Sequence, residues 1–457
     1  MKKVIDFLNT HHDRFDQELI EILKIPSISS NPDNVEDMHV TARLLETEMR
    51  RIGMDNCKVF ETDGHPVVYS EWVKAPGKPT VLIYGHYDVQ PVDPVDLWSS
   101  PPFEPVIKGD RIYARGSADD KGQIYIHLKA IEACLSVNNE LPVNVKLVFE
   151  GEEEVGSPHL EDFIQDNSEM LSADYVVISD TPMFREGYPG ITYGLRGLAY
   201  LQLNLRGTNT DLHSGSFGGL VKNPINALVE ILAQMKDEDG RILIPGFYDD
   251  VLPITEVEHD KLSNLPFSPD EFAKNIGAPV LFGEAGYEDL ERLWARPTFD
   301  INGIWGGFQG EGAKTVIPAE AHAKVSMRLV ADQDPEDISN KFIAYVKSLL
   351  PASIEADINA MHGGFGYVTD INNPGLQAGV RALKKAFDNE VDFLREGGSI
   401  PIVKVFADII KAPVLLLGYG LPDQNAHAPN ENFSLFNYHK GIESIVYFFE
   451  ELGGLNK

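Results

Sequence analysis

The first part of the chain alternates continuous apolar runs with helical periodicity. Residues 79–89, 143–153 and 174–180 are short apolar runs that predict buried strands. Helical periodicity over 119–137 and a start signal at Ser157–Pro158 predict helices between these strands. The order strand, helix, strand, helix, strand is typical of an α/β sheet with parallel members.

A different pattern begins near residue 188, where glycine and proline interrupt the apolar runs. Residues 198–207 alternate with period two, which predicts a half-buried strand, and a helix is expected from Asn223–Pro224. The stretch 240–315 shows no clear period and is expected to be irregular. A strand at 320–330 and a helix capped by Asp334–Pro335 follow it.

The α/β pattern resumes near residue 371 with a helix, an apolar run at 412–420 and an amphipathic helix at about 433–452. The sequence therefore predicts a discontinuous α/β domain with a mostly parallel sheet, interrupted by an α+β domain. The expected segments are residues 1–192 and 371–457 for the α/β domain and residues 193–370 for the inserted domain.

Composition changes this picture mainly through charge. The 457 residues carry a net charge of -31, which disfavours nucleic acid and anionic membranes as partners because both would repel the protein. Two cysteines are too few for a disulfide framework, and no apolar stretch approaches the roughly 20 residues of a membrane helix. The N-terminal segment lacks the apolar core of a secretory signal, so a cytoplasmic location is expected.

Candidate chemistry lies where the predicted strands end. His86 and Asp88 close the run at 79–89, and residues two apart on a strand point to the same face. His86 can therefore bind a metal while Asp88 orients its ring. A purely structural His-Asp pair is the alternative.

Two acidic segments and two isolated residues complete this set. Asp119–Asp120 begins the predicted helix, where one aspartate can bridge two cations, although a helix N-cap is the alternative. Glu150–Glu154 holds four carboxylates in five residues, which fits either a cation site or a solvated loop. Asp180 ends the run at 174–180, and His427 lies in a polar loop.

The shared position of these residues favours chemistry over the structural alternatives. In open α/β sheets, ligands bind at the carboxyl ends of the strands. Imidazole favours zinc, and carboxylates favour manganese among other divalent ions, so a site for two divalent cations is expected. Its ligands would be His86, Asp119, Glu154, Asp180 and His427.

In this order, the motifs resemble metallopeptidases of family M20, in particular the branch of cytosolic nonspecific dipeptidases and carnosinases. The resemblance runs along almost the whole chain and rests on these segments: GHYDVQP (85–91), YARGSADDKG (113–122), FEGEEEVGS (149–157), ISD (178–180), TDLHSGSFGG (210–219), GAKTVIP (312–318), REGGSIP (395–401) and the His427 loop PDQNAH (422–427).

The resemblance implies a fold and a role for each matching residue. The fold would be a zinc-peptidase-like α/β catalytic domain with an inserted lid and dimerisation domain. Asp119 would bridge two divalent ions, with zinc expected and manganese or cobalt as alternatives. Glu153 would be the general base, Asp88 would support His86, and the Asp119–Asp120 peptide bond would be cis.

The resemblance also implies a homodimer formed by the inserted domain, with residues that reach the partner's site. His213 would stabilise the oxyanion, and Thr315 and His362 would contact the substrate from the partner subunit. Arg328, Gly398 and Ser399 would hold the substrate carboxylate. A turn cap at His213 and a surface strand position at Arg328 are the structural alternatives.

The implied activity is hydrolysis of dipeptides or short peptides by metal-activated water. An N-acyl or N-succinyl amino-acid amidohydrolase would use the same catalytic motifs, because its substrates, like dipeptides, carry a carboxylate that the site must bind. A non-catalytic metal-binding dimer is the alternative of another class. Glu153 beside Glu154 disfavours it, since a base that ligates nothing has no use in an inactive site.

Overall fold

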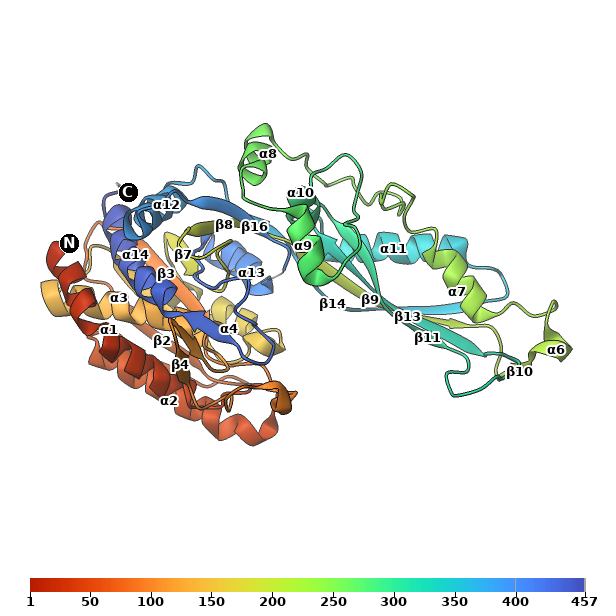
Figure 1. Cartoon of the computed structure of the whole chain (residues 1–457), viewed down its shortest axis with the longest axis horizontal. Coiled ribbons are helices and arrows are strands. Elements are labelled where there is room, and N and C mark those ends of the chain that lie inside the picture. The colour runs from red at the N-terminus through yellow and green to blue at the C-terminus, as the bar shows by residue number, and fades with distance from the viewer. Residues whose placement is uncertain (399, 456–457) are drawn as a thin grey trace. The chain divides into compact units, whose positions relative to one another are not determined.

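The structure is a computed structural model of the chain, and it describes residues 1–398 and 400–455. The chain divides into two compact units (Figure 1). Unit 1 comprises Met1–Tyr193, Thr369–Leu394 and the segment from Ile402 onward, and unit 2 comprises Gly194–Val368 and Arg395–Pro401. The short segment 395–401, expected with the α/β domain, thus lies in unit 2.

Unit 1 is built on a large mixed sheet with the order β1-β2-β6-β3-β7-β17-β8. Its central strands β6, β3, β7 and β17 are parallel, and β1, β2 and β8 pair antiparallel with their neighbours. The strands are β1 (Asp55–Phe60), β2 (Val67–Trp72), β3 (Thr80–His86), β6 (Asn144–Glu150), β7 (Tyr175–Ile178), β8 (Gly190–Leu195) and β17 (Val414–Leu416). Two further short strands of the chain are β15 (Tyr367–Val368) and β16 (Asp392–Glu396).

The helices that accompany this sheet confirm the α/β class expected from the sequence. Every residue of α3 from Lys121 to Cys134 is buried. Apolar residues therefore lie on all sides of this helix and not on a single face. Helix α14 packs against α1, α3 and α12, and α1 also packs against α3. The helices are α1 (Lys2–Leu23), α2 (Val35–Arg51), α3 (Lys121–Asn138), α4 (Leu160–Asp166), α5 (Ser168–Leu171), α12 (Pro374–Phe387), α13 (Pro401–Ile410) and α14 (Leu435–Gly453).

The smaller elements of unit 1 lie between these. The 3-10 turns are η1 (Pro32–Asn34), η2 (Val95–Leu97) and η3 (Glu153–Val155), and a three-stranded sheet has the order β18-β5-β4. Its strands are β4 (Val106–Lys108), β5 (Arg111–Tyr113) and β18 (Asn432–Ser434). This small sheet brings the C-terminal part of the chain beside the segment that leads into α3.

One predicted helix start is wrong. The sequence places a helix N-cap at Ser157, but α4 begins at Leu160. Ser157 has a left-handed φ of 51°, and its hydroxyl donates a hydrogen bond of 2.8 Å to Glu150. The side chain is therefore engaged by the preceding strand and does not cap the helix.

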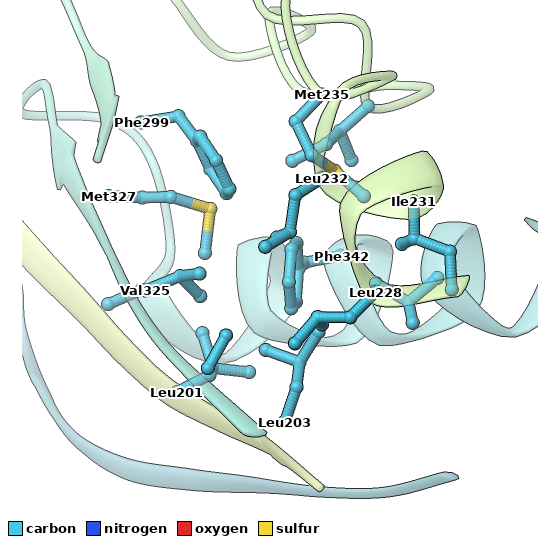
Figure 2. Close-up of a cluster of buried hydrophobic side chains, with 14 of the residues drawn as sticks. Leu201, Leu203, Leu228, Ile231, Leu232, Met235, Phe299, Val325, Met327 and Phe342 are labelled. Atoms are coloured by element: carbon cyan, nitrogen blue, oxygen red, sulfur yellow. The ribbon is translucent and has the colours of Figure 1, made fainter. Parts of the chain in front are cut away.

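Unit 2 contains a four-stranded antiparallel sheet with the order β11-β13-β9-β14. Alternate side chains of β9 and β13 are buried against helices α7 and α11, as the period-two pattern predicts (Figure 2). Asn223 and Asp334 cap these two helices at the predicted positions. The elements are β9 (Gly197–Arg206), β11 (Thr298–Gly306), β13 (Glu320–Leu329), β14 (Glu355–Gly364), α7 (Pro224–Leu232) and α11 (Pro335–Leu349).

The stretch 240–315 is more regular than expected. It contains three short helices before β11, and a side chain caps each of the first two. The caps are Thr255 and Ser268, which satisfy backbone N–H groups at the first turn. The helices are α8 (Glu256–Ser263), α9 (Pro269–Ile276) and α10 (Asp289–Trp294).

A two-stranded ribbon in unit 2 pairs β10 (Leu212–His213) with β12 (Val316–Ile317), and α6 (Ser214–Phe217) follows it. Across the described residues, none of the helices combines the length and apolar character that crossing a membrane would take.

Candidate metal centre

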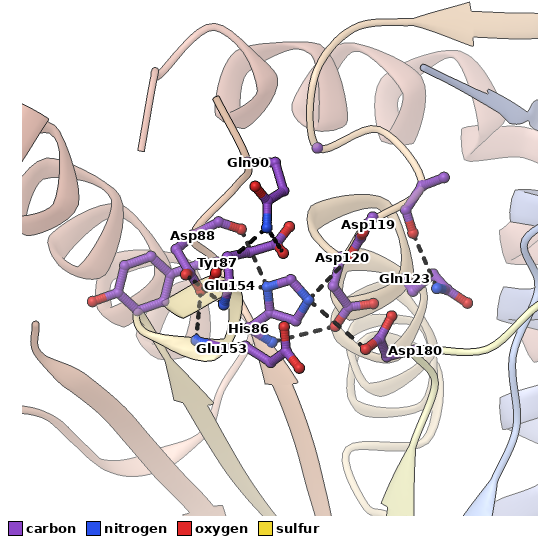
Figure 3. Close-up of polar contacts among 12 residues, drawn as sticks. His86, Tyr87, Asp88, Gln90, Asp119, Asp120, Gln123, Glu153, Glu154 and Asp180 are labelled. Atoms are coloured by element: carbon purple, nitrogen blue, oxygen red, sulfur yellow. Dashed lines mark hydrogen bonds and ion pairs between the residues drawn. The ribbon is translucent and has the colours of Figure 1, made fainter. Parts of the chain in front are cut away.

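The predicted ligands from three adjacent strands lie at one edge of the unit 1 sheet. His86 is the last residue of β3, Asp180 follows β7, and Glu154 lies in η3 directly after β6. Because β6, β3 and β7 are parallel neighbours, their carboxyl ends meet at the same edge (Figure 3). The shared position that the sequence indicates is therefore present in the fold.

Asp119 lies at the centre of two potential ligand groups. His86, Asp119 and Asp180 form one group, and Asp119, Glu154 and His427 form the other. Asp119 Oδ1 lies 3.1 Å from His86 Nε2, and Asp119 Oδ2 lies 2.9 Å from His427 Nε2. Each oxygen of one carboxylate thus faces a different histidine, which is the arrangement that a bridging ligand requires.

The remaining distances close each group. His86 Nε2 is 4.0 Å from Asp180 Oδ2, and His427 Nε2 is 3.2 Å from Glu154 Oε2. Imidazole nitrogens and carboxylate oxygens are ligands that suit zinc and other divalent ions. The donor set therefore fits two divalent cations that share Asp119.

Asp88 supports both sides of this centre. Its side chain is fully buried, and Asp88 Oδ1 lies 3.3 Å from His86 Nδ1, the nitrogen that faces away from Asp119. The two carboxylate oxygens also accept hydrogen bonds from the backbone N–H groups of Glu153 (3.2 Å) and Glu154 (3.0 Å). Asp88 thus orients the histidine ring and fixes the turn that carries both glutamates.

The two glutamates of η3 have different surroundings. Glu154 accepts a hydrogen bond of 2.8 Å from Gln90 and contacts His427. Within the described chain, the carboxylate of Glu153 has no hydrogen bond or ion pair, and its backbone is held by Asp88. Burial raises the pKa of Glu153 to about 7, and the neighbouring Glu154 and Asp119 carboxylates contribute. Such a carboxylate is suited to accept a proton near neutral pH.

Asp120 does not cap helix α3, although that alternative fits its position in the sequence. Its side chain makes no capping hydrogen bond, and Oδ2 instead accepts one of 3.3 Å from the backbone N–H of His86. The Asp119–Asp120 peptide bond is cis, as expected. The second aspartate of the pair thus fixes the backbone of a candidate ligand, a role that the sequence did not predict.

The electrostatics of this edge show an excess of negative charge. Burial, together with neighbouring carboxylates, raises the pKa of Asp180 and of Asp120 well above the usual range. Hydrogen bonds to Asp119 and Glu154 raise the pKa of His427 to about 10. Two imidazoles do not balance the carboxylates of Asp88, Asp119, Asp120, Glu153, Glu154 and Asp180, so cations suit this edge.

The predicted residues outside this centre lie in unit 2. His213 accepts a hydrogen bond of 3.0 Å from the N–H of Gly215, so here it caps a turn. Thr315 lies beside it, since its carbonyl accepts from the N–H of Ser214 at 3.0 Å. Arg328 and His362 occupy the sheet face opposite the helices, and His362 stacks on Tyr200 at 5.0 Å.

A cavity of about 410 Å³ in unit 2 is lined by Arg328 together with Arg196 and Asp300. Burial lowers the pKa of Arg328, whose guanidinium is half-buried. Gly398 belongs to the same unit, whereas Ser399 lies outside the described residues. The structure thus brings His213 close to Thr315, and it places Arg328 at a cavity, all within one unit.

Comparison with known proteins identifies the family. Residues 82–451 match the model of peptidase family M20/M25/M40. The chain is 34% identical to the Cys-Gly metallodipeptidase dug1 of Schizosaccharomyces pombe, covering 100% of this chain and 99% of that protein. It is 32% identical to the Beta-Ala-His dipeptidase of Homo sapiens, covering 100% of this chain and 93% of that protein.

A solved structure supports the same assignment at the level of the fold. The M20 family metallo-carboxypeptidase Sso-CP2 from Sulfolobus solfataricus matches with a TM-score of 0.85 and 36% identity, over 96% of this chain and 99% of that one. The resemblance that the motifs indicate is confirmed. The chain therefore belongs to peptidase family M20, and it is a metallopeptidase with the α/β fold of that family.

Proposed function

We propose that this protein is a dipeptidase that hydrolyses short peptides at a two-metal centre. The observation that carries the proposal is the difference between the two glutamates. Glu154 contacts His427, whereas the Glu153 carboxylate has no hydrogen bond or ion pair with any other residue that the structure describes. A dipeptide substrate is supported by the relatives named Cys-Gly metallodipeptidase and Beta-Ala-His dipeptidase.

His86, Asp119 and Asp180 would hold one divalent ion, and Asp119, Glu154 and His427 the other. Zinc suits the imidazole ligands best, and manganese or cobalt also suit the set. When bound, the ions would supply Lewis acidity toward the attacking water and the scissile carbonyl.

Glu153 would take a proton from the attacking water and return it to the leaving amine. Asp88 would hold the Glu153 backbone and the His86 ring in place through the contacts described above. Arg328 and Gly398, with Ser399, would bind the carboxylate of the substrate, because a guanidinium matches a carboxylate with two parallel hydrogen bonds.

The substrate class can be tested with one panel of compounds. Chelated enzyme, reloaded with zinc, manganese or cobalt, should hydrolyse Cys-Gly or β-Ala-His dipeptides much faster than N-acetylated or N-succinylated amino acids. A tripeptide distinguishes a strict dipeptidase from a carboxypeptidase, the activity named for Sso-CP2. Hydrolysis of acylated amino acids alone would contradict the dipeptidase proposal. If none of these compounds were hydrolysed with any of the metals, the proposal that the protein is a peptide hydrolase would be wrong.

We also propose a cytoplasmic homodimer in which unit 2 provides residues for the partner's centre. His213 would stabilise the oxyanion there, and Thr315 and His362 would contact the substrate. His213 is exposed and Thr315 lies beside it, which is compatible with a role outside their own subunit.

Subunit mixing tests this arrangement. The His213→Ala and Glu153→Ala variants should each be nearly inactive, and a mixture that has exchanged subunits should regain up to about a quarter of wild-type activity. Half of the chains would then be in heterodimers, each with one intact centre. No recovery after demonstrated exchange would contradict shared centres, and a protein that sediments as a monomer while active would contradict the dimer.

A further inference from the structure

Glu431 lies at the point where the small sheet of unit 1 meets the loop that carries Asp119. It directly precedes β18, which pairs antiparallel with β5 so that Asn432 lies opposite Tyr113. The ladder continues by one bond, because the carbonyl of Glu431 accepts from the N–H of Ala114 at 3.1 Å. The backbone of Glu431 is thus fixed beside residues 115–120.

The side chain of Glu431 is only 1% exposed and accepts four hydrogen bonds from this loop. Oε1 accepts from the backbone N–H groups of Ala118 (2.9 Å) and Asp119 (3.1 Å). Oε2 accepts from the backbone N–H of Gly116 (2.9 Å) and from Arg115 Nη1 (2.7 Å). One carboxylate therefore fixes the backbone on both sides of Ala118, and it does so with charge-assisted bonds.

Arg115, which pairs with Glu431, also contacts the segment that follows β3. Its guanidinium is also 1% exposed, donates to the carbonyl of Pro91 at 3.0 Å, and lies 5.4 Å from the ring of Trp98. The segment that contains Pro91 follows the strand of His86. Arg115 and Glu431 therefore form a buried ion pair that joins three segments of the chain at the edge of the centre.

Glu431 also belongs to the loop that supplies His427. Between them, the side chain of Asn430 accepts from the N–H of Ser99 at 2.7 Å and donates to the carbonyl of Leu97 at 3.0 Å. The loop is thereby anchored near both of its functional residues. The residue that contacts the Asp119 backbone thus also fixes the end of the segment from which His427 extends.

We propose that Glu431 is a positioning residue for the metal centre, which sets Asp119 between His86 and His427. The inference rests on the proposed function, because it requires that Asp119 bridges two ions. Glu431 belongs to neither ligand group and faces backbone N–H groups and Arg115, so it acts on the centre through Asp119. The effect of losing it should therefore appear first in metal affinity.

The Glu431→Gln variant tests this with minimal change of shape. An amide has one acceptor oxygen, whereas both oxygens of Glu431 accept two donors each. In either orientation, the new NH₂ group meets two N–H donors, and the loop must shift. We expect the affinity for zinc, measured by competition with a chromophoric chelator, to fall by roughly 10–100-fold, which is typical of outer-shell partners.

Two further variants separate positioning from general destabilisation. Glu284→Gln is the matched control, because Glu284 forms a buried bidentate pair with Arg296 in unit 2 (2.8 and 2.9 Å). It should leave zinc affinity unchanged. The double variant Arg115→Met with Glu431→Gln removes both buried charges, yet it still lacks the carboxylate for the loop N–H groups, so its zinc affinity should stay low.

Glu431→Asp keeps the charge with a shorter reach, and it provides the measurement if the Gln variant does not fold. An intermediate loss of zinc affinity and a shifted visible spectrum of the cobalt-loaded protein are expected. Wild-type zinc affinity in Glu431→Gln or, if that variant does not fold, in Glu431→Asp, or full recovery in the double variant, would overturn the proposal. These readouts measure metal binding directly, so they stand apart from whether dipeptides are the substrate.

Discussion

Glu153→Gln should lower kcat for dipeptide hydrolysis by about 10²–10⁴-fold, the range typical of a general acid–base residue. The amide keeps the shape of the side chain but cannot accept a proton from water. Glu153 belongs to neither ligand group, so the variant should retain both ions, as measured by atomic emission. KM should change little, because the lost interaction is made during proton transfer.

The neighbouring Glu152→Gln variant is the control for this substitution. Glu152 lies in the same turn but hydrogen-bonds His159 at 2.8 Å, so its loss should leave kcat nearly unchanged. The pH profile gives an independent check. The base must be ionised, so wild-type kcat should fall as pH is lowered through the pKa of Glu153. This decrease at low pH should be absent from the profile of the Glu153→Gln variant. A variant with both ions and wild-type kcat would refute the assigned base.

Asp119→Asn should weaken both metal sites at once. Each oxygen of Asp119 faces a different histidine, and the amide nitrogen of asparagine cannot replace the second oxygen as a ligand. We expect an affinity loss beyond the roughly 10–100-fold seen for residues that only support a ligand. Activity at limiting metal should be close to background.

His427→Ala provides the comparison, because His427 belongs to one ligand group only. That variant should lose one ion per chain and keep the other with an affinity close to that of the wild type. Titration with zinc, followed by calorimetry, distinguishes the two patterns. If Asp119→Asn lost a single ion and kept the second unchanged, the bridging role of Asp119 would be wrong.

Much of the metal centre follows from local sequence pattern. The strands that deliver His86, Glu154 and Asp180 are continuous apolar runs, and a buried parallel strand needs only such a run and a short turn. Their carboxyl ends then meet at one edge by the geometry of parallel pairing. For this reason the metal ligands from neighbouring strands could be predicted without tertiary information.

The features that sequence did not predict depend on distant contacts or on short elements. Ser157 carries a helix-start pattern, but Glu150 binds its hydroxyl instead. Helices α8, α9 and α10 are only 8, 8 and 6 residues long, which is too short to display a period over 240–315. Glu431 contacts Arg115 across 316 positions in sequence, and no local pattern indicates that pairing.

The place of β17 in the sheet means that unit 1 is completed late during synthesis of the chain. This strand lies between β7 and β8 in the unit 1 sheet, yet it is synthesised after the whole of unit 2. On the ribosome, unit 2 therefore has all its strands while β7 still exposes an unpaired edge, a site prone to intermolecular pairing. Loop 423–431 emerges later still, so the ligand group of Asp119, Glu154 and His427 becomes complete only after unit 2 has been synthesised.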